Sequence, residues 1–246
     1  MKSSGGLETH QKTILGAALL SLALWAIPGV HFLMLPLQYL NTHIHELCHA
    51  LTAMATGGTV LGIVVRPNGS GETPIMGGSL FFEVSAGYIG AAMVGALIIL
   101  LGHREQLAKN TLRVVAVVLV LSVLGFVLRG GDFAVDAFGA VTGVLWAIIL
   151  WFVSVYLKGS KLLFATQFIG VQQCLNAVQS LYVLIQLSAF GETHSDAQIM
   201  AENTHIPAIV WAAGWSAFSL LIVGLALRRS WKKEQPSSPR PGSSSV

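Results

Sequence analysis

Residues 81–101, FFEVSAGYIGAAMVGALIILL, decide the class of fold. This stretch contains a single charged side chain, Glu83, and it is long enough to cross the hydrocarbon core of a bilayer as one helix. Comparable apolar stretches lie on either side of it, at 14–37, 112–128, 137–157, 162–189 and 206–227. Only 10% of the residues are charged, against about 25% in a soluble domain. The sequence therefore predicts an all-α polytopic membrane protein with about six transmembrane helices.

The segment 41–80, between the apolar stretches 14–37 and 81–101, has a different pattern. Residues 41–56 predict a shorter helix, which ends at the glycine pair 57–58. Residues 59–65 are rich in β-branched side chains, and 67–71 read as a turn. We therefore expect a re-entrant helix followed by a short strand-like hairpin. Irregular backbone at membrane depth is tolerated only where protein buries it or where it lines a wet cavity.

Charge distribution predicts the domain limits and the orientation. We expect a polar N-terminal segment at 1–13, a membrane-embedded domain at 14–227 and a disordered basic, Ser/Pro-rich tail at 228–246. If both termini are cytoplasmic, every basic residue except Arg66 and Arg129 lies on the cytoplasmic side, as the positive-inside rule favours. This topology puts 41–80 at the opposite face. Because topology explains the net charge of +3, we expect a lipid bilayer and no nucleic acid as a partner.

The chemistry-bearing motif is His45-Glu46-Leu47-Cys48-His49, an H-E-x-x-H pattern. Positions i and i+4 share one face of a helix, so both imidazoles can bind one metal ion. The glutamate beside the first histidine can then take a proton from a water that the metal activates. The motif predicts a zinc site with His45 and His49 as ligands and Glu46 as the general base. The alternative is a helix at the membrane–water interface whose polar face contacts water and binds no metal.

This motif and its surroundings resemble the site-two protease family of intramembrane zinc metalloproteases, in its small, diverged bacterial-type branch. The resemblance covers roughly 41–101 and rests on HELCHA at 45–50, the glycine pair, the strand-like segment and SAGYIG at 85–90. It implies one zinc ion per chain, bound by two histidines and one aspartate, and cleavage of transmembrane or membrane-proximal peptide substrates. It also implies a multi-pass protein of a bacterial plasma membrane.

The third metal ligand departs from the family pattern, because the chain has no Leu-Asp-Gly segment. Among its three aspartates, we favour Asp196, which follows an amide-rich helix and falls on the same face as the motif in the predicted topology. Asp196 could instead cap the helix that begins at Ala197. The alternatives for this ligand are Asp132, Asp136, Glu192, His194, His205 and Glu83.

The amide-rich stretch 162–189 carries a polar stripe. At 100° per residue, Gln172, Asn176 and Gln179 fall within an arc of about 60°, so they share one helix face. Such a stripe in a membrane helix must face protein or water. We expect these three side chains to line an active-site cavity, and ordinary helix–helix hydrogen bonding is the alternative.

Two hypotheses about function follow. The first is a zinc-dependent intramembrane endopeptidase with Glu46 as the general base. The second is a catalytically silent scaffold or transporter of the same fold. A complete H-E-x-x-H argues against a silent site, and a transporter should show paired charges along a path, of which this chain has few.

Overall fold

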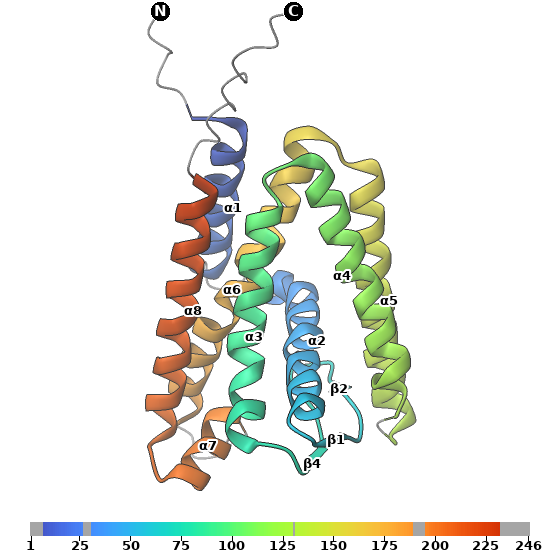
Figure 1. The fold of residues 1–246 in the computed structure, drawn as a ribbon, viewed down its shortest axis with the longest axis vertical. Helices are drawn as coiled ribbons and strands as arrows, with labels where there is room; N and C mark the ends of the chain where they lie inside the picture. Colours follow the sequence, from blue (N-terminus) through green and yellow to red (C-terminus); the bar gives the residue numbers. More distant parts are fainter. Residues whose placement is uncertain (1–6, 27–30, 130, 189–194, 232–246) are drawn as a thin grey trace, which may run out of the picture.

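The computed structural model describes residues 7–26, 31–129, 131–188 and 195–231, and 81% of this part is helical. The helices are α1 (Thr9–Ala26), α2 (His31–Ala55), α3 (Leu80–Leu101), α4 (Glu105–Gly125), α5 (Phe133–Tyr156), α6 (Gly159–Ser188), α7 (Asp196–Thr204) and α8 (Ala208–Trp231), with a 3-10 turn at Val127–Arg129. Figure 1 shows them as an upright bundle, with α2 and α3 near its middle and α7 at one end.

Four two-residue strands connect α2 to α3. The outer pair is β1 (Thr59–Val60) with β4 (Ile75–Met76), and the inner pair is β2 (Val64–Val65) with β3 (Gly71–Glu72). Both pairs are antiparallel, so the segment folds back on itself as two nested hairpins. The strand-like hairpin predicted from the β-branched residues is therefore present.

The N-terminal part is divided differently from the prediction. Instead of a span at 14–37 and a separate helix at 41–56, α1 ends at Ala26 and α2 runs without interruption from His31 to Ala55. The sequence between these two helices contains Pro28-Gly29; a residue before a proline disfavours helix, and glycine is a poor helix former. Pro36 lies inside α2, and its carbonyl accepts a hydrogen bond from Trp146 Nε1 at 2.6 Å.

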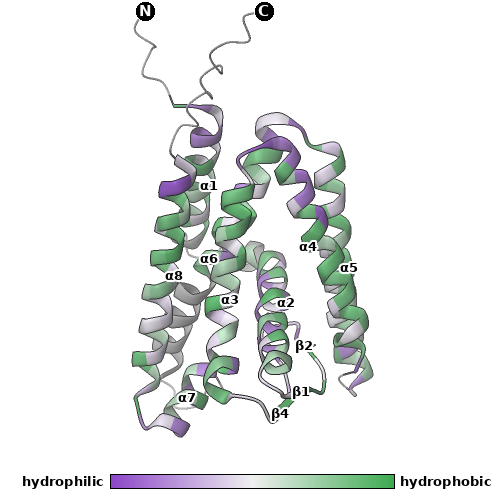
Figure 2. Cartoon of the chain, viewed as in Figure 1, coloured by the Kyte–Doolittle hydropathy of each residue, from purple (hydrophilic) through white to green (hydrophobic). Residues whose placement is uncertain are grey.

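Four helical segments are long and apolar enough to cross a membrane within the described residues: α3, α4 with the 3-10 turn, α5 and α8. Only 28–50% of their most apolar windows is buried, so most of these apolar side chains point outward, as lipid contact requires. Figure 2 shows the hydrophobic colour along α4, α5 and α8. The predicted spans at 14–37 and 162–189 are not among the four, so the count of six and the re-entrant arrangement stay predictions.

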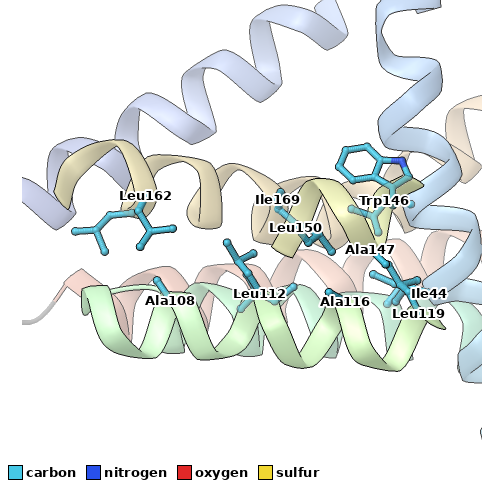
Figure 3. Packing of buried hydrophobic residues seen from close by; sticks show 14 residues of the cluster. Ile44, Ala108, Leu112, Ala116, Leu119, Trp146, Ala147, Leu150, Leu162 and Ile169 are labelled. Carbon is cyan, nitrogen blue, oxygen red and sulfur yellow. The ribbon is translucent and has the colours of Figure 1, made fainter. Parts of the chain in front are cut away.

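Two apolar clusters hold α2 in place. The first lies among α2, α3, α4, α5 and α6 and includes Ile44, Leu112, Leu150 and Ile169 (Figure 3). The second packs Leu47 and Ala50 of α2 against the hairpin and the end of α4. The face of α2 that carries the motif histidines is turned toward α3.

Candidate metal centre

Two histidines of α2 lie one helical turn apart and face the same way. The ring centroids of His45 and His49 are 4.6 Å apart, with planes 73° from parallel. This is the arrangement that spacing i and i+4 on one helix predicts. Both side chains are nearly buried, with 10% and 7% of their surfaces exposed.

Asp196 joins them from α7, far along the chain. Its Oδ2 lies 3.1 Å from His45 Nε2 and 3.4 Å from His49 Nε2. Each of the three residues offers one ligand atom, and these atoms all lie within 4.8 Å of one another. A tetrahedral zinc ion with bonds of about 2.0–2.2 Å separates its ligands by about 3.3–3.6 Å. The two distances from Asp196 are close to this range, and two imidazoles with one carboxylate are a donor set that suits zinc.

The start of α7 leaves the Asp196 carboxylate available. Ser195 is the N-cap residue, and its Oγ accepts a hydrogen bond from Gln198 N at 3.3 Å. Asp196 is the first residue within the helix, so the alternative role as cap belongs to its neighbour. Burial alone would raise the pKa of the Asp196 carboxyl, but the charge of His49 and hydrogen bonds from both histidines outweigh it and hold this pKa well below its usual range.

The His49 ring is oriented by a backbone group of α3. Its Nδ1 lies 2.6 Å from the carbonyl oxygen of Glu83, which can only accept a hydrogen bond. Nδ1 therefore donates to this carbonyl, and Nε2 is the ring nitrogen that faces Asp196. Ligating histidines of metal sites use the same second contact to fix the tautomer and the ring orientation.

The general-base candidate, Glu46, is 5% exposed. Its Oε2 accepts a hydrogen bond from Thr73 Oγ1 at 2.8 Å, and the same hydroxyl lies 3.1 Å from the Glu46 carbonyl oxygen. Its Oε1 lies against Gly71, where an added Cβ would collide with it. The inner hairpin thus covers Glu46.

Helix α3 contacts the metal-binding face through a glycine and an aromatic ring. A Cβ at Gly87 would collide with Nε2 of both His45 and His49. The next residue, Tyr88, packs edge-on against the His45 ring at 4.6 Å between centroids. Tyr88 also stacks on Trp215 of α8 at 5.0 Å, so aromatic side chains connect α8 to the histidine face.

The other residues weighed as third ligand have different surroundings. Asp132 caps α5 by accepting from two backbone N–H groups, and Asp136 accepts from Gly131 N at 2.9 Å. The Glu83 carboxylate accepts from Thr56 Oγ1 at 3.1 Å, and His205 ends α7 with a positive φ of 59°. Glu192 and His194 lie outside the described residues.

The predicted cavity stripe is described at one position only. Gln172 of α6 is 2% exposed, and its backbone oxygen accepts from Asn41 Nδ2 at 3.5 Å. Its amide nitrogen is buried and has no hydrogen-bond partner among the described residues. Asn176 and Gln179 also belong to α6, but their side chains lie outside the described part of the chain.

Sequence reasoning missed the groups that orient the site. The Glu83 carbonyl leaves no trace in the sequence, because every residue has one. Thr73 lies beyond a turn, and only the fold of the hairpin reveals that it reaches Glu46. Gly87 does have a signal, since small residues in a membrane helix often mark a close approach of another helix.

Two histidines and a glutamate on α2 and an aspartate on α7 form the set of side chains that a membrane-embedded zinc metallopeptidase uses. The model of the M50B-like peptidase family matches residues 14–226 of the 246. The chain therefore belongs to this family, the site-two protease family, whose peptidases are zinc metalloproteases. No curated protein and no solved structure matches the chain.

Proposed function

We propose that the protein is a zinc-dependent intramembrane endopeptidase that hydrolyses peptide bonds of transmembrane or membrane-proximal substrates. One observation carries the proposal: the ligand atoms of His45, His49 and Asp196 lie within 4.8 Å of one another, and Glu46 follows His45 directly on α2. Family membership supports the same function.

Each residue has a distinct role in this function. His45, His49 and Asp196 would hold one zinc ion per chain. The bound ion supplies a Lewis acid for the substrate carbonyl and for the attacking water. Glu46 takes the proton from that water and returns it to the leaving amine.

Substrate entry involves the strands and the interior of the bundle. A transmembrane substrate arrives as a helix whose carbonyls are already hydrogen-bonded, so its backbone must be unwound before attack. The short strands at 59–76 offer edges onto which an extended segment can add as a further strand. Gln172, Asn176 and Gln179 are proposed to line the cavity that receives it.

The test is cleavage of a panel of model transmembrane substrates by purified protein in liposomes. Glu46→Gln is expected to lower the rate by about 10²–10⁴-fold while zinc stays bound, because only the proton acceptor is lost. A zinc chelator is expected to abolish cleavage.

Glu202→Gln is the matched control, since it removes an exposed carboxylate of α7 and should leave the rate unchanged. Cleavage that survives both Glu46→Gln and the chelator would contradict the proposal. A protein that neither cleaves nor holds zinc would instead favour the silent scaffold or transporter.

A further inference from the structure

The hairpin between α2 and α3 is fixed to α2 along one face of that helix. Tyr39 Oη donates to Pro67 O at 2.7 Å, and Thr42 Oγ1 donates to Gly69 O at 2.7 Å. Glu46 follows at the next position on this face, where Thr73 Oγ1 donates to its Oε2 at 2.8 Å. Positions 39, 42 and 46 recur at helical spacing, so the hairpin lies along the helix axis.

Gly71 is required here by space and not by backbone conformation. Its φ lies outside the left-handed region, so an alanine could adopt the same backbone. A Cβ at this position, however, would collide with Glu46 Oε1 and would come within 2.5 Å of Thr42 Cγ2. The missing side chain leaves room beside the carboxylate oxygen that Thr73 does not hold.

The two contacts together define a cradle for the Glu46 carboxylate, formed by Gly71 and Thr73. Oε2 accepts a hydrogen bond from the Thr73 hydroxyl, and Oε1 packs against Gly71, where a Cβ would collide with it. A proton acceptor works best when its position is fixed before the reaction, and misplacement of about 1 Å can cost about 100-fold in rate.

We propose that Thr73 is a positioning residue for the general base, and that the absence of a side chain at Gly71 leaves room for the second carboxylate oxygen. This inference rests on the proposed function. It assigns the inner hairpin a part in catalysis that is separate from any contact with substrate.

The activity test compares Thr73→Val, Thr73→Ser and Gly71→Ala. Thr73→Val keeps the shape and removes the hydroxyl, so kcat is expected to fall about 10–100-fold, with KM and zinc content unchanged. Thr73→Ser should restore most of kcat. Gly71→Ala should also lower kcat, because its Cβ displaces the carboxylate. A valine variant with wild-type kcat, or a serine variant as slow as valine, would overturn the proposal.

A second readout does not depend on activity. In the zinc-free protein, the decreases in Tm caused by Thr73→Val and Glu46→Ala should not add in the double variant, because each removes the same hydrogen bond. Thr13→Val is the control: its hydroxyl donates to His10 O, and its effect should add to that of Glu46→Ala.

Additive decreases for Thr73→Val and Glu46→Ala would overturn the proposed contact. Wild-type protein that cleaves no substrate would count against the proposed function, while the Tm comparison would still decide whether Thr73 holds Glu46.

Discussion

At the scale of single residues, the candidate metal centre depends on close approach. The imidazole nitrogens of His45 and His49 lie so near α3 that no side chain fits at Gly87. Tyr88 then covers the His45 ring from the adjacent position. The metal-binding face is therefore shaped by α3 as much as by α2.

Gly87→Ala is expected to displace both histidine rings and to weaken zinc binding about 10–100-fold, comparable to the loss of a group that orients a ligand. Zinc affinity of the purified protein, measured by competition with a chelating dye, checks this. Gly214→Ala in α8 is the control, because nothing lies within 4 Å of a Cβ there. Equal affinities in the two variants would show that α3 does not shape the site.

At the scale of elements, the sequence predicted what depends on local spacing. The motif places His45 and His49 on one face of a helix, and the apolar stretches mark α3, α4, α5 and α8. The limits of α2 were not predicted, because 31–40 is apolar and reads as a continuation of the preceding span. Pro28-Gly29 lies in the sequence between the two described helices, and Pro36 lies within α2.

The third metal ligand could not be found from local spacing. Asp196 lies 147 residues beyond His49 along the chain, and no local pattern connects the two. The predicted topology places all three aspartates on the face of the motif, so Asp196 was favoured because it follows the amide-rich helix. The structure brings Asp196 to 3.1 Å from His45, while Asp132 caps α5. The contacts of Thr73 and of the Glu83 carbonyl could not be predicted, because they arise only when the hairpin and α3 close over α2.

At the scale of the whole molecule, the two ends of the bundle differ in charge. Gln11 Nε2 donates to Trp231 O, which joins the start of α1 to the end of α8, and Gly159 N donates to Glu105 Oε2, which joins the starts of α6 and α4. Figure 1 shows both pairs at the same end of the bundle. The basic residues of those segments gather there. Figure 1 shows the strands and α7 at the opposite end. This arrangement agrees with the charge asymmetry that predicts cytoplasmic termini.

Cysteine labelling tests the orientation. In intact cells, a membrane-impermeant maleimide is expected to label Glu72→Cys in the hairpin but to label Glu8→Cys and Arg229→Cys only after permeabilisation. All three positions are exposed, and the unsubstituted protein, with Cys48 and Cys174, gives the background. The reverse pattern would mean that the termini are outside. Labelling of all three from one side would contradict the separation of the two ends.

The central claim is that His45, His49 and Asp196 together hold zinc. The most direct measurement is zinc per chain in purified wild type, Asp196→Asn and Asp132→Asn, by elemental mass spectrometry after dialysis against a weak chelator. About one zinc per chain is expected in wild type and in Asp132→Asn, and little in Asp196→Asn, because two histidines alone bind zinc weakly. Equal zinc in wild type and Asp196→Asn, or none in wild type, would contradict this claim.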